Sequence, residues 1–420
     1  MIINTNFGDM STTGHWTAAD PAGTYVVAAG TPTRFPRSYI CLLRFKGFCV
    51  GHPLDKWAVV NGGSTTQASH PVVASRLRPT GMTWGLPVEA EYGSNWYAVA
   101  WNALSSNGQS VVSVRTCSDY PVPGMPGLFA PISNELRPFD FNWSFRPSVE
   151  LAIKSARFAV AAGGSSFDGR YRPYLRIYHL HGEWITPAFA VDDPPGPEPG
   201  QGAIFTSLAS FFHPGLGKEL LVVAWSITPT LLPSGSLAPS SGVKFKVFDW
   251  EGNTVYPTTH VDGAATYAVS AAATDRRIVL TWHRQQRVYL RSWLPGGSSE
   301  SSGPILVSPT TTAGDFAPRM AKVVWNGKDY AAVSWTRKDT SGLLPCWKMF
   351  RLDGGPVAVA SQIPVGTSPH QMPDLLDSEG NGVGLFNCGS KLMLLQTFFT
   401  RPDAVAERGL CRRCIRPPGF

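Results

Sequence analysis

The stretch Tyr97-Ala98-Val99-Ala100-Trp101 decides the fold, because close copies of it recur along the chain. The copies are separated by about 50–70 residues, a period that is typical of propeller-type repeats. Runs of small and apolar residues of this length predict strands that are buried on both faces. The other copies are residues 221–225 (LVVAW), 278–282 (IVLTW), 331–335 (AAVSW), 25–29 (YVVAA), 158–162 (FAVAA) and the degenerate 383–387 (VGLFN).

The copy at residues 331–335, the sixth in chain order, lies in a clear four-strand unit. The dipeptide Asn326-Gly327 precedes it and is a strong hairpin signal, and Asp353-Gly354-Gly355 ends a later strand. Four antiparallel strands with glycine turns between them describe one blade of a propeller. The predicted strands of this unit are residues 319–324, 330–335, 347–352 and 357–363.

Seven copies predict an all-β fold, a seven-bladed β-propeller of four-stranded antiparallel blades. The last unit has predicted strands at 374–376, near Val383 and at 391–398, and it lacks a clear fourth strand. Residues 2–8 resemble the fourth strands of other units, so we expect the N-terminal strand to close the last blade and leave no open edge. The predicted organisation is a propeller over residues 1–398, followed by a basic C-terminal arm over residues 399–420.

The repeat resembles a diverse group of bacterial and phage-borne propeller repeats over about residues 1–398. In that group the buried strand reads roughly Tyr-Leu-Val-Val-Trp, and a basic residue lies on the next strand. The resemblance implies the propeller fold and a protein that is secreted, surface-exposed or part of a virion. The matching basic residues are Arg44, Arg115, Arg176, Lys246, Arg291 and Lys348. They could face a ligand as a ring of cations, or form salt bridges that were copied with the repeat.

Composition excludes several classes of protein. Of the 420 residues, 43% are apolar and only 15% are charged, with 42 glycines and 36 prolines. This composition argues against a disordered chain and against a helical bundle. The net charge of +7 is spread out without a Lys/Arg run, so we expect no nucleic-acid partner. There is no apolar run long enough for membrane insertion and no recognisable signal peptide.

Motifs for known chemistry are missing from the sequence. No GxSxG, HExxH, Walker A or Rossmann pattern occurs. Cys411 and Cys414 form a single CxxC pair without the second pair that a zinc site requires. His179 and His181 alternate on one strand but have no evident third ligand. We therefore predict no cofactor, no metal and no catalytic residues.

The candidate ligand- or partner-binding site is the loop face that carries the turns after the second strands and the connections between blades. Functional residues concentrate on loops that a rigid scaffold holds. Cations and aromatic rings there could bind an acidic glycan or receptor; ordinary solvated loops are the alternative. The predicted site residues are Arg34, Arg37, Asn102, Asp168, Arg170, Tyr171, Arg172, His283, Arg284, Arg287, Arg337 and Lys338.

The arm is the predicted assembly element, since a tail with cysteines and a terminal aromatic residue is unusual for a solvating segment. Its candidate residues are Arg408, Cys411, Arg412, Arg413, Cys414, Arg416 and Phe420. The sequence thus predicts a non-enzymatic structural and binding propeller, most simply a virion component such as a phage tail or surface protein that docks onto other structural proteins of an assembly. The alternatives are a secreted or surface carbohydrate-binding lectin, and a propeller glycosidase or lyase. We expect the protein in a virion or outside the cell.

Overall fold

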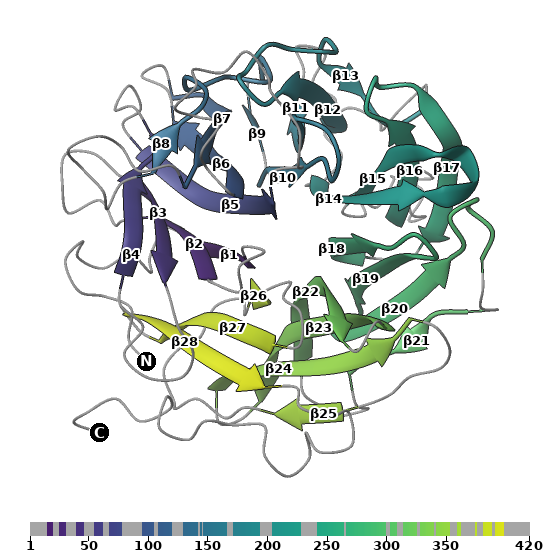
Figure 1. Cartoon of the computed structure of the whole chain (residues 1–420). Helices are drawn as coiled ribbons and strands as arrows, with labels where there is room; N and C mark the ends of the chain where they lie inside the picture. The colour runs from purple at the N-terminus through teal and green to yellow at the C-terminus, as the bar shows by residue number, and fades with distance from the viewer. Residues whose placement is uncertain are drawn as a thin grey trace.

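The first strand of each sheet lies at the centre of the molecule (Figure 1). In the computed structural model each of these strands contacts the first strand of the next sheet, and β26 contacts β1. The first strands therefore follow one another around an axis. They are β1 (His15–Ala19), β5 (Gln67–Leu77), β10 (Ser148–Leu151), β14 (Ile204–His213), β18 (Thr266–Ala273), β22 (Gly314–Trp325) and β26 (Asp374–Leu375).

The structure describes part of the chain. The described residues are 15–19, 25–30, 39–45, 54–61, 67–77, 95–104, 108–119, 129–141, 143–144, 146–165, 171–193, 204–227, 242–263, 266–299, 303–308, 314–325, 328–339, 342–352, 359–362, 374–375, 381–388 and 391–398.

Every copy of the recurring motif lies in the second strand of its own sheet. These strands pair antiparallel with the first and third strands on either side. Trp101, Trp225, Trp282 and Trp335 are buried, as predicted. The second strands are β2 (Tyr25–Gly30), β6 (Asn95–Leu104), β11 (Arg157–Ser165), β15 (Lys218–Ile227), β19 (Ile278–Arg284), β23 (Lys328–Asp339) and β27 (Asn381–Cys388).

The hydrophobic core is divided into layers that lie between neighbouring sheets. One layer joins Trp96 of the second sheet to Phe158 of the third, and another joins Phe245 of the fourth to Trp282 of the fifth. The second strands β6, β11, β15 and β19 therefore bury side chains on both of their faces. This explains why the motif is a continuous apolar run and does not alternate with polar residues.

The outer strands complete the sheets. The third strands are β3 (Ile40–Phe45), β7 (Ser110–Ser118), β12 (Tyr171–His179), β16 (Gly242–Asp249), β20 (Arg287–Trp293), β24 (Gly342–Arg351) and β28 (Lys391–Phe398). The fourth strands are β4 (Leu54–Val59), β8 (Ala130–Pro131), β13 (Phe189–Ala190), β17 (Thr254–Asp262), β21 (Ile305–Leu306) and β25 (Val359–Gln362). The short strand β9 (Trp143–Ser144) also pairs with β11, and a 3-10 turn, η2 (Pro214–Leu216), joins β14 to β15.

The all-β propeller fold is confirmed, because the described residues form seven antiparallel sheets around one axis. The last sheet has three strands among the described residues. The predicted closing strand, residues 2–8, and the predicted arm, residues 399–420, lie outside the described ranges, so closure by the N-terminus and the division into two segments stay predictions. Within the described ranges, no helix has the length and apolar character that crossing a membrane demands.

The third sheet departs from the motif in an informative way. Its second strand has Ala162 at the position where four other sheets have a tryptophan, and Gly163 and Gly164 follow. A Cβ atom on Gly164 would overlap the ring of Phe141, and one on Gly163 would overlap Ile204. Phe141 thus fills the space that the strand itself leaves empty, and it stacks on Phe139 with 4.9 Å between ring centroids.

Candidate functional site

The two ends of the propeller differ in the connections they carry. We call "hairpin face" the end with the turns from first to second strands, such as residues 152–156 and 214–217. We call "linker face" the end with the turns from second to third strands, such as Gln285 and Gln286, and with the starts of the first strands. Those predicted site residues that the structure describes belong to the linker face.

On the linker face, four of the described candidates, Asn102, Arg172, Arg284 and Arg337, bind partners within the fold. Asn102 is buried and donates from Nδ2 to Ser144 Oγ at 2.8 Å. Arg172 pairs with Asp192, with 2.9 Å from Nε to Oδ1. Arg287 is exposed, whereas Tyr171 and His283 are half-buried. Arg34, Arg37, Asp168, Arg170, the side chain of Lys338 and the arm residues lie outside the described part, so their roles stay predictions.

Arg337 and Arg284 take part in a repeated structural device. Arg337 Nε lies 2.8 Å from Asp315 Oδ1, and Trp335 donates to the same carboxylate at 3.1 Å. In the preceding sheet Arg284 and Trp282 bind Asp262 in the same way, at 3.0 and 2.9 Å.

In both copies the aspartate lies 20 positions before the tryptophan, and the arginine follows the tryptophan by two. The device fastens the buried motif strand to the segment that enters its sheet, so the two guanidinium groups serve the fold.

The recurring basic residues of the third strands also bind within the fold. Arg115 donates to the backbone oxygen of Val60 at 3.2 Å, and Arg176 donates to that of Pro138 at 3.1 Å. Lys246 lies 2.7 Å from Asp193. In each case the partner belongs to the segment that links the preceding sheet to the sheet of the cation. Of the two interpretations, the structure favours ties between sheets over a ring of cations facing a ligand.

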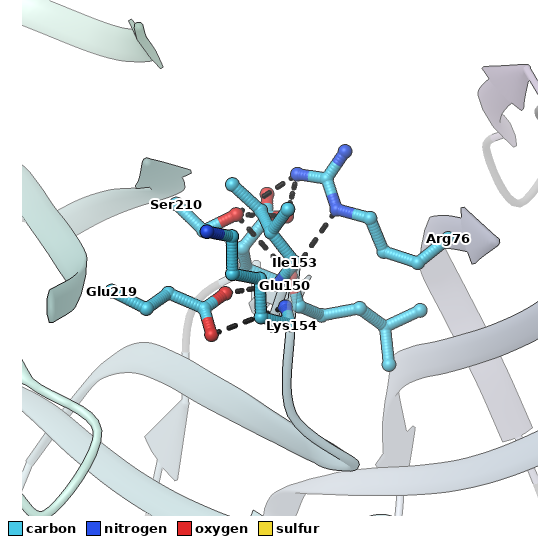
Figure 2. A network of polar contacts seen from close by, with 7 residues as sticks. Arg76, Glu150, Ile153, Lys154, Ser210 and Glu219 are labelled. Atoms are coloured by element: carbon cyan, nitrogen blue, oxygen red, sulfur yellow. Dashed lines mark hydrogen bonds and ion pairs between the residues drawn. The ribbon is translucent and has the colours of Figure 1, made fainter. Parts of the chain in front are cut away.

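A polar network on the hairpin face was not predicted from the sequence. Arg76, next to the end of β5, places Nη2 2.7 Å from Glu150 Oε1 on β10 and 2.9 Å from Ser210 Oγ on β14. Ser210 Oγ also donates to Glu150 Oε1 at 3.1 Å. Arg76 Nε donates to the backbone oxygen of Leu151 at 3.3 Å. The network therefore joins the first strands of three consecutive sheets (Figure 2). Because the first strands surround the axis, we call them axial strands.

A second carboxylate, from Glu219 on β15, binds the turn that follows Glu150. Its two oxygens accept hydrogen bonds from the backbone N–H groups of Ile153 and Lys154. Ser155 Oγ adds a contact at 3.4 Å. Figure 2 shows Arg76 and Glu219 approaching the same segment from opposite sides. Two carboxyl groups, one guanidinium and one hydroxyl are thus brought together at one end of the axial strands.

Burial dominates the electrostatics of this network. It raises the pKa of Glu150 above the ordinary value, although the charge of Arg76 and the hydrogen bonds from Ser210 and Arg76 act in the opposite direction. Burial likewise raises the pKa of Glu219 against the backbone hydrogen bonds from Ile153 and Lys154. The Glu150 side chain is 15% exposed, which leaves it in contact with solvent. A partly accessible carboxyl with a raised pKa is suited to donating a proton.

One signal in the sequence could have identified these residues. The segment 148–151 (SVEL) places a single charged residue, Glu150, in a short axial strand. A charged residue at such a position is expensive to bury unless it has a partner or a role. The partners come from other sheets, 60 to 74 residues away in sequence, so no local pattern reveals them.

No metal site is evident in the part of the chain that the structure describes, where no three His, Cys, Asp or Glu side chains gather. His179 and His181 stack with 5.5 Å between ring centroids, and His181 Nε2 lies 3.3 Å from Glu183 Oε2. Cys41 and Cys117 are buried thiols whose pKa is raised to about 12 by burial, so both are unreactive near neutral pH.

Comparisons with known proteins give a likeness of fold. No protein-family model matches the sequence, and no curated protein matches it. Prolyl oligopeptidase B from Galerina marginata aligns with a TM-score of 0.49 and 11% identity, over 94% of this chain and 49% of that chain. Acylaminoacyl peptidase from Pyrococcus horikoshii aligns at 0.46 and 10%, over 96% and 55%. The Dos1 propeller aligns at 0.45 and 8%, over 93% of both chains.

The chain spans about half the length of the peptidases that it matches. Glycoside hydrolases also align, among them a GH62 α-L-arabinofuranosidase catalytic domain from Coprinopsis cinerea over 59% of this chain. The sequence predicted a non-enzymatic virion component, and the comparisons contradict both parts of that prediction, because the similar structures include several enzymes. At 8–12% identity the likeness describes the fold, so the reaction has to be argued from the residues of this chain.

Proposed function

We propose that this chain is a carbohydrate-active enzyme that cleaves glycosidic bonds by acid–base catalysis on the hairpin face, with Glu150 as the proton donor. One observation carries the proposal: a carboxyl with a raised pKa is held between Arg76 and Ser210 at the axis and keeps 15% of its side chain exposed. Such a group retains its proton at a higher pH than a free glutamate. Departure of a sugar hydroxyl requires a proton donor of this kind.

Glycoside hydrolysis uses a second carboxyl group beside the reacting bond. We assign this role to Glu219, which is fixed by the backbone N–H groups of Ile153 and Lys154. In the proposed reaction Glu150 gives its proton to the glycosidic oxygen, and the bond from the anomeric carbon to that oxygen breaks. Water then adds to the anomeric carbon and gives its proton to Glu219. Arg76, 2.7 Å from Glu150 Oε1, stabilises the carboxylate that Glu150 becomes.

An exposed indole on the third sheet fits a carbohydrate substrate. Trp184 is 55% exposed, and the guanidinium of Arg176 lies 5.6 Å from its ring centroid. Aromatic faces of this kind stack on the apolar faces of sugar rings. Polysaccharides extend beyond the site of cleavage, so an aromatic surface away from the network is compatible with a polymeric substrate.

The test is turnover by single variants on a panel of aryl glycosides and polysaccharides. We expect Glu150→Gln to lower kcat by about 10²–10⁴-fold, because the amide keeps the size and hydrogen bonds of the acid but has no proton to donate. Glu219→Gln should also lower kcat. Glu183→Gln is the matched control, since that glutamate is 71% exposed and lies outside the network. Thermal unfolding of each variant shows whether it has folded.

Three results would overturn the proposal. One is a folded wild-type protein that releases no sugar from any member of the panel. Another is a folded Glu150→Gln variant with the turnover of the wild type. A variant set in which Glu183→Gln loses as much activity as Glu150→Gln would also exclude a specific role for the network.

We further propose that the seven sheets are copies of one ancestral unit of the Tyr-Leu-Val-Val-Trp type. The position of the motif copies in the second strand of every sheet supports this proposal. So does the cation on the third strand, which in four sheets lies 5.3–5.7 Å from an aromatic ring two residues later.

A further inference from the structure

Three basic residues lie on or just before the axial strands, toward the linker face and away from the carboxylate network. They are His70 on β5, Arg146 just before β10, and Arg319 on β22. The positions of these residues along the axis can be compared through the pairing of each first strand with its second strand. This works because the second strands share one motif. Ala100, Ala161 and Ser334 each occupy the fourth of the five motif positions. Their partners on the first strands, which therefore lie at one level, are Val72, Ser148 and Arg319.

His70 and Arg146 each precede this common level by two residues, and Arg319 lies on it. At about 3.3 Å per residue, the three positions fall within about 7 Å of one another along the axis. They come from the second, third and sixth sheets, which are separated in sequence but place their first strands around the same axis. The topology therefore gathers three basic groups at one level around the axis.

The backbone at His70 breaks the regular strand. Its φ is +52°, in the left-handed region that histidine rarely adopts, and the register shifts between Ser69 and Val72. This is a β-bulge, a feature that re-aims a side chain and is common beside functional sites. The imidazole Nδ1 lies 3.0 Å from Ser69 Oγ.

The charges that act on His70 are both positive. The pKa of His70 is lowered to about 4, chiefly by burial and also by the guanidinium groups of Arg146 and Arg319. The imidazole is therefore neutral at pH 7 and can donate one hydrogen bond beside two fixed cations. A concentration of positive charge with a neutral donor, partly shielded from water, attracts an anion.

The axial strands contribute to the same environment. Each first strand pairs with a second strand on one side only among the described residues. Its other edge faces the axis (Figure 1). Backbone N–H groups on such an edge are additional donors for an anion.

From this arrangement we infer that the linker-face end of the axis binds an oxyanion through His70, Arg146 and Arg319. The oxyanion would be the carboxylate of an acidic sugar or a free phosphate ion, which share this chemistry. The inference does not depend on the proposed hydrolytic activity. Six residues separate His70 from Arg76 on the same strand, so the two sites are about 20 Å apart.

The experiment is calorimetric titration of the full-length chain at constant ionic strength with galacturonate, galactose and inorganic phosphate. We expect binding of at least one anion and no binding of galactose, which matches galacturonate except for the carboxylate. Galacturonate alone would identify an acidic sugar as the ligand, and phosphate alone would identify the free ion. Absence of binding for both anions at millimolar concentrations overturns the inference.

Variants locate the site. Arg146→Gln and Arg319→Gln should each weaken anion binding at least tenfold, whereas Arg287→Gln, at an exposed arginine of the rim, should leave it unchanged. If Arg287→Gln weakens binding as much, the effect is one of net charge and the inference fails. Should an arginine variant not fold, His70→Asn provides the second test, because asparagine tolerates a positive φ. An unchanged affinity in folded His70→Asn and Arg319→Gln also overturns the inference.

Discussion

Asp315 and Arg337 form an ion pair with side chains that are 1% and 4% exposed. The equivalent pair in the preceding sheet, Asp262 and Arg284, is more open, since the Arg284 side chain is 30% exposed. The same chemistry therefore occurs in two sheets at two depths. Breaking a deeply buried pair leaves a charge without compensation, which costs far more than breaking a pair that water can reach.

This difference gives a prediction at the residue scale. Asp315→Ala should lower the free energy of unfolding by about 3–5 kcal/mol, because Arg337 is left buried without its carboxylate. Asp262→Ala should cost about 1–2 kcal/mol, since water can solvate Arg284. Urea titration of both variants is the measurement. Equal losses would show that burial is not what sets the strength of these pairs.

The same residues show the limit of prediction from sequence for side chains. The sequence predicts Arg284 and Arg337 as ligand-binding cations on loops, whereas the structure places them within β19 and β23. Their partners lie about 20 positions upstream, and the pairing exists only once each strand has met the segment that enters its sheet. Glu150 and Glu219 were missed for the same reason, because their partners belong to other elements.

Among the elements, β11 differs from the other motif strands through Gly163 and Gly164. Phe141, from the segment before β10, occupies the space beside Gly164 and packs against Tyr174 with 4.9 Å between ring centroids. A neighbouring segment thus adds an aromatic ring to this layer, and Gly164 leaves the room that the ring requires.

We expect Gly164→Ala to lower the free energy of unfolding by about 1–3 kcal/mol, because the added methyl group overlaps the Phe141 ring in a filled core. Gly296→Ala is the control, since no atom lies near the position of its Cβ. Thermal and urea unfolding of the two variants test this. A Gly164→Ala protein as stable as the control would mean that the Phe141 layer is loosely packed.

At this scale the sequence is most informative where a strand is buried on both faces. The predicted third strand of the last unit, residues 391–398, coincides with β28. The predicted strand at residues 330–335 lies inside β23. Fourth strands were harder to predict, and β8, β13 and β21 have only two residues each. Strands this short have no recognisable hydrophobic pattern in the sequence, since their position depends on the third strand beside them.

For the molecule as a whole, stability should depend on pH through groups with shifts of opposite sign. The pKa of His70 is lowered to about 4 from 6.5, so the unfolded chain binds more protons between these values and the free energy of unfolding rises with pH across this window. The pKa of Glu150 is raised from 4.5, so its contribution is largest in acid and is lost as pH rises through the raised value.

Two variants separate these contributions. The stability advantage of the wild type over His70→Asn should grow by up to about 3 kcal/mol from pH 4 to pH 6.5. Its advantage over Glu150→Gln should shrink as the pH rises above 4.5. Urea titrations at a series of pH values provide the measurement. Parallel pH profiles for all three proteins would contradict both assignments.

The propeller could be predicted from the chain, whereas the reaction could not. A motif repeated seven times specifies equivalent sheets, but the residues that meet at the axis come from different copies. The predicted face, the linker face, was chosen from loop positions alone, and the carboxylate network lies at the other end.

The contact between β26 and β1 has a consequence for the order of folding. Every other neighbouring pair of sheets is consecutive in the chain, so its contacts close short loops and can form early. The contact between the first and last sheets closes the longest loop and carries the largest entropic cost. We therefore expect the contact between the first and last sheets to form last during folding and to open first under denaturant. The amide hydrogens of these two sheets should then exchange with solvent sooner than those of the five sheets between them in the chain.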